Sequence, residues 1–298
     1  MQPWQYLPNP WRQALEDFPG QRSASLEEIR FRLDRPVCLY GAGWHDVLTH
    51  PGLPQVVTAD QLEQIVSVLV DHSLYARADE LRQGFLTLAG GHRVGIAGRA
   101  VVEGGRVVTV SRVSGLNMRI GRHIRGPAEA LIELLRKRGL GGSWLLASPP
   151  RAGKTTLLRD LVFCLSNEAR RVVVVDERSE VAGCGGTGIF GFDVGCHTDV
   201  LDAWPKPEGV ETALRTLGPD IIAVDELGGE ADLAAIIHAR YSGVDVLATV
   251  HARSREDLFR RPAFAGVLRQ GAFDAVVFLS SNPVPGTVDD VWAWSGAP

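Results

Sequence analysis

The sequence contains little lysine, no long apolar run and no excess of positive charge. Only three of its 31 basic residues are lysines, at Lys137, Lys154 and Lys206, so arginine supplies almost every generic positive charge. A lysine kept in such a chain is expected to be needed for its compact ammonium, which the planar guanidinium of arginine cannot replace. The net charge of −4 over 298 residues gives no general attraction to nucleic acid or to anionic lipid.

We also expect the chain to be neither a membrane-spanning nor a secreted protein. No segment approaches the ~18 consecutive apolar residues that a bilayer span requires. The first residues, Met1 to Gln5, carry no basic segment followed by an apolar core, so we expect no secretory signal and a cytoplasmic protein. Four cysteines occur without Cys-x-x-Cys spacing: Cys38, Cys164, Cys184 and Cys196. We therefore expect free thiols and no zinc site.

What the sequence does contain is the composition of folded domains. It is 45% hydrophobic and 22% charged, and its length suggests two domains at ~150 residues each. Residues 1–140 combine a helix-period pattern over 58–72 with strand patterns between 85 and 110 that are broken by Gly-Gly pairs. These pairs indicate hairpin turns, so we expect a smaller N-terminal α+β domain with an antiparallel meander.

Residues 141–298 show a different pattern, in which apolar strands alternate with helices. The expected strands are 144–147, 172–175, 221–224, 244–250 and 275–279, and the expected helices are 154–166, 209–217, 231–241 and 255–261. Strands that are apolar throughout are typical of a parallel sheet covered on both faces. The sequence therefore predicts an α/β domain with a mainly parallel sheet.

The most specific motif lies between the first strand and the first helix of this α/β half. It matches the phosphate-binding pattern G-x-x-x-x-G-K-[ST], with serine at the first glycine. The residues are Ser148, Pro149, Pro150, Arg151, Ala152, Gly153, Lys154, Thr155 and Thr156. Gly153 lets backbone N–H groups converge on phosphate at a helix N-terminus, Lys154 supplies charge to the terminal phosphates, and Thr155 offers a hydroxyl to Mg²⁺. The motif predicts a site for ATP and Mg²⁺.

Acidic residues follow two of the predicted strands. Asp176 and Glu177 end one strand, and Asp225 and Glu226 end another. The carboxyl ends of parallel strands lie at the same edge of a sheet, so either pair is expected near the phosphate loop. A solvated strand end is the plain alternative for each pair. We favour Asp225 and Glu226, because their strand, 221–224, is the second expected strand after the phosphate-loop helix.

Two further basic features are less specific. His251 ends the strand 244–250 at the same edge, although a lone histidine is more often structural. Arg119, Arg122 and Arg125 recur every third residue, which is typical of a solvated face. The alternative is that Arg119 or Arg122 binds nucleotide phosphates across an interface, where an arginine finger contributes ~10³–10⁵ in rate.

The ordered set of motifs resembles the stage III sporulation protein AA family, P-loop ATPases of endospore-forming bacteria that are similar to type II and type IV secretion and pilus motor ATPases. The phosphate loop alone would be generic, but the ordered set is specific and covers most of the chain. It comprises residues 26–32, 84–100, 149–160, 175–180, 193–195, 198–202, 219–226 and 248–251.

The resemblance implies a RecA-like motor domain, 141–298, after an N-terminal domain, 1–140, with a nucleotide site completed in a ring, expected to be a hexamer. Residues 176–180 occupy the place of the Asp box of secretion ATPases and 249–251 that of the His box, which makes His251 an expected functional residue. The water-activating carboxylate is left as Glu226 or Glu177. We favour Glu226, with Asp225 in the Mg²⁺ shell and Glu177 orienting water.

The resemblance also implies a location and a partner. The protein is expected at the membrane facing the forespore in the mother cell, where it energises a channel complex with an integral membrane protein similar to the secretion platform. Two other functions stay open. One is a nucleic-acid-dependent ATPase, against which the charge and the lack of a basic-aromatic stripe argue. The other is a nucleotide-gated scaffold with little turnover. The glycine-rich loop 183–191 has no assigned role.

Overall fold

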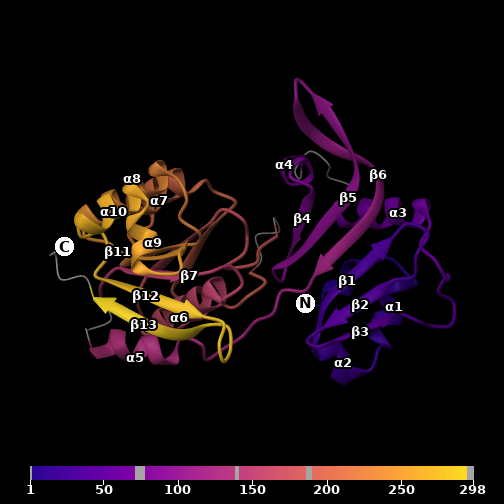
Figure 1. Cartoon of the computed structure of the whole chain (residues 1–298), viewed down its shortest axis with the longest axis horizontal. Helices are drawn as coiled ribbons and strands as arrows, with labels where there is room; N and C mark the ends of the chain where they lie inside the picture. Colours follow the sequence, from indigo (N-terminus) through magenta and orange to yellow (C-terminus); the bar gives the residue numbers. More distant parts are fainter. Residues whose placement is uncertain (1, 71–77, 138–140, 186–189, 294–298) are drawn as a thin grey trace. The chain divides into compact units, whose positions relative to one another are not determined.

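The chain forms two compact units (Figure 1). The structure, a computed structural model, describes residues 2–70, 78–137, 141–185 and 190–293. Unit 1 consists of residues 1–122 with 183–191, and unit 2 of residues 123–182 with 192–298. Within the described residues, no helix is both long enough and apolar enough to cross a bilayer.

The division between the units falls earlier than the expected boundary at residue 140, which lies in a stretch, 138–140, outside the described residues. The reason is helix α5 (Glu129–Lys137), which packs in unit 2. The buried carboxylate of Asp160 accepts hydrogen bonds from the N–H groups of Gly126 and Ala128, both at 2.9 Å. These bonds satisfy free donors at the start of α5 and attach this helix to α6 (Lys154–Asn167) of unit 2.

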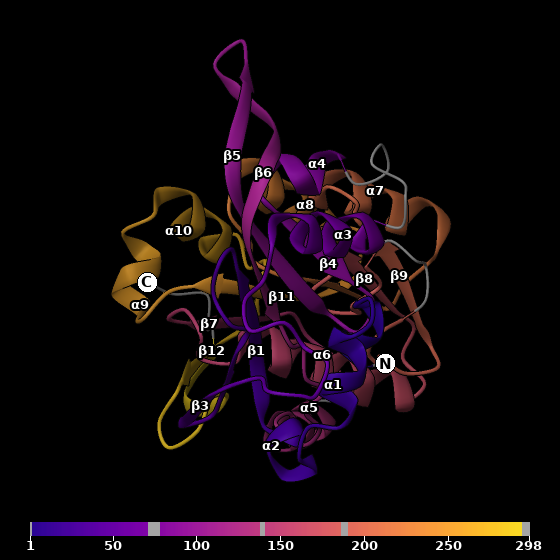
Figure 2. The same ribbon diagram turned by 90° about the vertical axis from the view of Figure 1, so that its right-hand side faces the viewer.

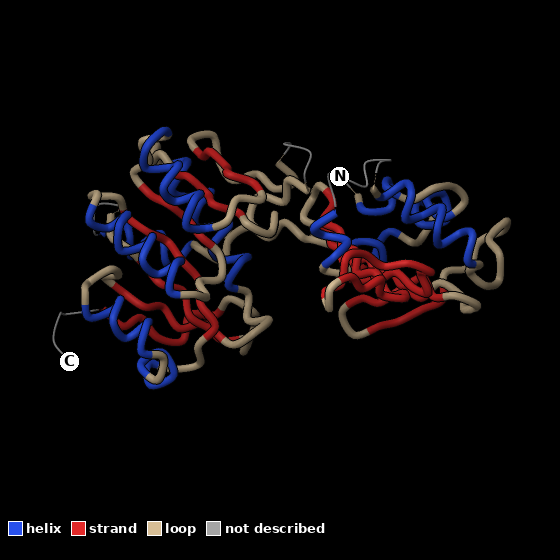
Figure 3. The backbone as a smooth tube through the Cα atoms, turned by 90° about the horizontal axis from the view of Figure 1, so that it is seen from above, coloured by secondary structure: helices blue, strands red, loops and turns tan. Residues whose placement is uncertain are grey.

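Unit 1 is built on a six-stranded sheet with the order β3-β2-β1-β6-β5-β4, in which neighbouring strands run antiparallel. Its strands are β1 (Leu26–Arg32), β2 (Cys38–Gly41), β3 (Trp44–Val47), β4 (Phe85–Leu88), β5 (His92–Glu103) and β6 (Arg106–Arg119). Its helices are η1 (Pro3–Tyr6), α1 (Trp11–Glu16), α2 (Gly20–Ala24), α3 (Ala59–Leu69) and α4 (Ala78–Arg82). Figure 3 shows the helices of this unit along one side of its strands.

The expected helix and meander of this half are both present. Helix α3 begins at a capping box in which Thr58 and Gln61 each bond the backbone N–H of the other, and Leu62 and Ile65 are buried on its inner face. The predicted end of this helix near residue 72 lies outside the described residues. The hairpin β5–β6 extends beyond its neighbours (Figure 2), because β4 and β1 pair only with its base. The predicted α+β class of this half is therefore confirmed.

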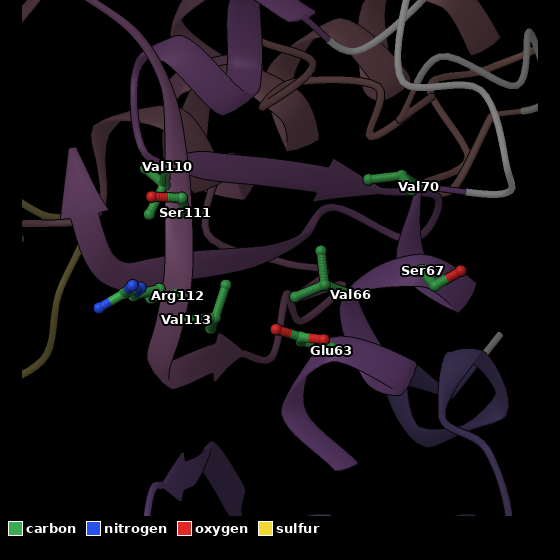
Figure 4. A pocket seen from close by; sticks show the side chains of 8 residues that line it. All are labelled: Glu63, Val66, Ser67, Val70, Val110, Ser111, Arg112 and Val113. Carbon is green, nitrogen blue, oxygen red and sulfur yellow. The ribbon is translucent and has the colours of Figure 1, made fainter. Parts of the chain in front are cut away.

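A groove in unit 1 lies between α3 and strand β6 (Figure 4). Val66 and Val70 line it from the helix side, and Val110 and Val113 line it from the strand side. The four valines share this lining with Ser67, Ser111 and one charged residue of each sign, Glu63 and Arg112, and no phosphate-binding motif borders the groove.

Unit 2 is a seven-stranded sheet with the order β13-β12-β7-β11-β10-β8-β9. Its strands are β7 (Trp144–Ser148), β8 (Val172–Asp176), β9 (Thr198–Asp202), β10 (Ile221–Val224), β11 (Asp245–His251), β12 (Ala275–Ser280) and β13 (Thr287–Ala293). Its other helices are α6 (Lys154–Asn167), α7 (Lys206–Thr216), α8 (Glu230–Tyr241), α9 (Arg255–Phe259) and α10 (Pro262–Arg269). Neighbouring strands are parallel except for β12 and β13. The predicted mainly parallel α/β class is confirmed.

The strand order brings the ends of β7, β11 and β10 together at one edge of the sheet. Strands β7, β8 and β10 are buried along their whole length, as apolar runs in a covered parallel sheet should be. Ser148 at the end of β7 is in register with His251 at the end of β11, and β11 pairs with β10 on its other side. The ends of three adjacent strands therefore meet at the start of α6.

Candidate functional site

The phosphate loop joins β7 to α6 through a backbone that requires glycine. Gly153 caps α6 with a φ of 84°, in the left-handed region. A Cβ atom there would lie 2.8 Å from the backbone nitrogen of Gly286. The N–H of Gly286 donates to the carbonyl oxygen of Ala152 at 2.9 Å, so the turn before β13 supports the loop from outside. Gly153 is thus needed both for its conformation and for its lack of a side chain.

Lys154 opens α6 and is held by two partners within unit 2. Its Nζ lies 2.9 Å from Nδ1 of His251 and 3.3 Å from the hydroxyl of Ser148. The residue is only 7% exposed, and burial lowers the pKa of its ammonium. Because an ammonium can only donate, His251 Nδ1 accepts and the ring proton is on Nε2. Ser148, which replaces the first glycine of the motif, is therefore an acceptor for Lys154.

Asp225 lies at the end of β10 between two threonine hydroxyls. Thr155 Oγ1 donates to its Oδ2 at 2.7 Å, and Thr249 Oγ1 donates to its Oδ1. Hydroxyl and carboxylate oxygens are the ligands that Mg²⁺ prefers, with water and phosphate completing its shell. Thr155 and Asp225 therefore fit a magnesium site beside the phosphate loop.

Glu226 has a strained backbone that Thr249 holds in place. Its φ is 55°, in the left-handed region that residues other than glycine rarely adopt. The Glu226 N–H donates to Thr249 Oγ1 and the Leu227 N–H to the Thr249 carbonyl, both at 2.8 Å. Its carboxylate lies 2.8 Å from Nη1 of Arg178 and 3.7 Å from Nε2 of His251. Strain of this kind is common at functional sites.

These groups line one pocket of about 380 Å³. It differs from the groove in unit 1 because its charged groups lie beside the phosphate loop. Its lining residues are Arg151, Gly153, Lys154, Thr155, Thr156, Glu180, Asp225, Glu226, His251 and Pro285. The structure thus gathers most of the predicted site residues, including His251, into one place.

Other predicted residues do not line this pocket. Pro149, Pro150 and Ala152 shape the loop without reaching the pocket wall, and Ser148 lies behind Lys154. The carboxylate of Glu177 instead pairs with the ammonium of Lys206. Glu180 lines the pocket, where Glu177 was expected. The sequence alone did not single out Glu180. The signal for it was present as the third carboxylate of the segment 176–180.

The two predicted phosphate-binding arginines belong to unit 1. Arg119 Nε lies 3.6 Å from Oε1 of Glu28. Arg122 Nη2 donates to the carbonyl oxygen of Leu26 at 3.1 Å. Their role towards a nucleotide stays a prediction.

Comparison with known proteins identifies the family and the fold of the chain. Residues 5–297 match the family model described as sporulation stage III, protein AA. The chain is 38% identical to stage III sporulation protein AA of Bacillus subtilis, over 97% of this chain and 94% of that protein. Its fold is similar to that of the ATPase DotB of Legionella pneumophila, with a TM-score of 0.59 and 14% identity over 89% of this chain and 74% of that one. It is also similar to the pilus retraction motor PilT, with a TM-score of 0.61 and 14% identity over 89% of this chain and 77% of that one.

The two kinds of likeness support different statements. Similarity to DotB and PilT at 14% identity shows a shared fold and nothing finer. The family match and the relative of nearly equal length confirm the resemblance on which the sequence analysis relied. The chain belongs to the sporulation stage III protein AA family.

Proposed function

We propose that unit 2 binds ATP with Mg²⁺ at the phosphate loop and hydrolyses it. One observation carries the proposal, namely that Lys154, the Thr155–Asp225 pair and Glu226 line a single pocket. Lys154 is placed to neutralise the terminal phosphates. Thr155 and Asp225 would hold Mg²⁺, which supplies charge neutralisation on the phosphate oxygens when bound.

Two carboxylates of the pocket, those of Glu226 and Glu180, act on the attacking water in different ways. Glu226 accepts a proton from water during in-line attack on the γ-phosphate, as a general base does in such reactions. Glu180, on the same pocket wall, orients this water in the role that the sequence analysis gave to Glu177. His251 holds Lys154 before ATP arrives and is released when a phosphate oxygen replaces its Nδ1. His251 thereby senses the occupied site.

Hydrolysis is proposed to drive a motor. The fold shared with DotB and PilT supports this proposal. In the assembled state, a hexameric ring, Arg119 or Arg122 of a neighbouring copy contributes charge to the nucleotide phosphates. The motor acts in the cytoplasm of the mother cell, at the membrane facing the forespore, on an integral membrane protein similar to a secretion platform. Nucleic acid is not an expected partner.

ATP turnover measured against protein concentration tests this function. Turnover per chain should rise steeply with concentration in the wild type, because the site is completed by a neighbouring copy. Glu226→Gln should lose ~10²-fold or more in kcat, and Arg119→Ala or Arg122→Ala should flatten the concentration dependence. Equal turnover in wild type and Glu226→Gln would contradict the enzyme and favour a scaffold. Stimulation by single-stranded DNA would instead favour a nucleic-acid-dependent ATPase.

A further inference from the structure

A buried arginine holds the backbone on which Glu180 is mounted. Arg159 lies on α6 and is 6% exposed. Its Nε donates to the carbonyl oxygen of Val181 at 2.7 Å, and its Nη2 donates to that of Glu180 at 2.6 Å. The guanidinium carbon lies 3.7 Å from the ring centroid of Phe192. The guanidinium is therefore fixed by the ring and by the two carbonyl groups.

The N–H groups of the same segment are held by a second charged side chain. The buried carboxylate of Asp176 accepts hydrogen bonds from Glu180 at 2.8 Å, Val181 at 3.0 Å and Ala182 at 2.8 Å. Burial raises the pKa of Asp176 to about 6 and lowers that of Arg159 to about 10. Both donors and acceptors of this short segment are thus satisfied by charged groups that are costly to bury.

Helix α6 connects this clamp to the phosphate loop. Lys154 and Thr155 form its first turn, and Arg159 follows five residues after Lys154 on the same helix. A helix rises 1.5 Å per residue and bends little over such a distance. The groups that bind phosphate and the group that holds the Glu180 backbone therefore move as one piece.

We propose that Arg159 is a positioning residue of the nucleotide site, which sets the place of the Glu180 carboxylate by holding the carbonyl groups of Glu180 and Val181. This inference rests on the proposed ATPase function. It assigns to Arg159 no contact with the nucleotide. Lysine is not a substitute, because a single ammonium lacks the planar fork that reaches both carbonyl groups and stacks on Phe192.

A double-mutant cycle on ATP turnover tests the inference. A misplacement of about 1 Å costs up to ~10²-fold in rate, so Arg159→Ala should lower kcat ~10–100-fold while KM for ATP changes less than about threefold. The same variant in a Glu180→Gln background should lower kcat by less than about twofold more. If the loss of kcat in the double variant equals the product of the losses in the two single variants, Arg159 acts independently of Glu180 and the inference is overturned.

Two further variants separate positioning from stability. Arg159→Lys keeps the positive charge and carries the test if Arg159→Ala does not fold. It should lose at least about fivefold in kcat at a Tm near that of the wild type, and wild-type kcat would overturn the inference. Arg136→Ala is the matched control, because it removes an exposed arginine that pairs with Glu168 on the same unit. Its kcat and KM should equal those of the wild type.

The outcomes also separate this inference from the function on which it rests. A wild type that neither binds nor hydrolyses ATP contradicts both. An active wild type that is inactivated by Glu226→Gln, but shows multiplying losses for Arg159→Ala and Glu180→Gln, contradicts only the role of Arg159.

Discussion

The ammonium of Lys154 lies 2.9 Å from Nδ1 of His251. The phosphate-loop lysine thus has an internal partner that ATP must displace. His251→Ala removes this competitor, so the Kd for ATP should be unchanged or up to ~10-fold lower, since a hydrogen bond to a charged group contributes ~1.5 kcal/mol. Turnover should nevertheless fall ~10-fold, because His251 no longer senses the γ-phosphate.

His251→Asn is the control for this prediction. The side-chain oxygen of asparagine can accept from Lys154 as Nδ1 does, so its Kd should stay near that of the wild type. Fluorescent-nucleotide titration measures both variants. Weaker ATP binding in His251→Ala would contradict the competition between histidine and phosphate.

Thr249 contacts both acidic residues that follow β10. It is fully buried, and its hydroxyl both accepts from the Glu226 N–H and donates to Asp225. Thr249→Val keeps the shape but leaves the N–H unpaired, which should cost about 1–3 kcal/mol in the free energy of unfolding and ~10-fold or more in kcat. Thr249→Ser keeps the hydroxyl and should restore most of kcat. Denaturant unfolding and steady-state kinetics check both, and equal kinetics for valine and serine would disprove this role.

The interior of unit 2 could be predicted from sequence because its signals are local. Strands β8 and β10 are short apolar runs that end in carboxylates, and the phosphate loop joins a strand to a helix. Strands β9 and β13 were not predicted. Each lies at an edge of the sheet and has partly exposed residues, so neither has the apolar run of a central strand.

The sequence did not predict that Glu180, rather than Glu177, lines the pocket. Which carboxylate reaches the pocket depends on the turn after β8, where Ser179 has a φ of 52° and Asp176 binds three N–H groups. The position of Glu180 further depends on Arg159, 21 residues earlier. The division at residue 122 likewise depends on Asp160, which binds groups 32 and 34 residues away. Such contacts leave no periodic pattern in the sequence.

An ion pair at the base of the sheet gives a pH prediction. Hydrogen bonds from Arg171, which precedes β8, lower the pKa of Asp220, which precedes β10, to about 2. A carboxyl with a lowered folded pKa stabilises the fold above its unfolded pKa of ~3.9. That contribution is lost as the pH falls towards 2.

Arg171→Gln should move the Asp220 pKa back towards its ordinary value, as carboxyl NMR titration would show. The stability difference from the wild type should be at most about 1 kcal/mol above pH 4, because the Arg171 side chain is exposed and solvent screens the pair. It should shrink as the pH falls through about 2, the folded pKa of Asp220, and vanish only below it. A stability difference between Arg171→Gln and the wild type that grows as the pH falls would contradict this prediction.

Gly183 and Gly191, two glycines of the segment to which no role was assigned, belong to unit 1 and contact the turn between β4 and β5. The N–H of Gly90 donates to the carbonyl of Gly183 at 3.0 Å. A Cβ on Gly191 would lie 2.1 Å from the nitrogen of Gly90, so Gly191→Ala should lower the free energy of unfolding by about 1–3 kcal/mol. Gly20→Ala is the control in the same unit, since nothing lies within 4 Å of its added Cβ. Denaturant unfolding should show a midpoint near wild type for Gly20→Ala, and equal midpoints for the two variants would refute the close packing.

Calorimetric titration of the purified protein with MgATP tests the central claim most directly, with Lys154→Ala as the matched variant. The account predicts a saturable heat at one site per chain in the wild type and its loss in Lys154→Ala, whose melting temperature should stay near that of the wild type. No heat of binding in the wild type, or equal binding in both proteins, would contradict it.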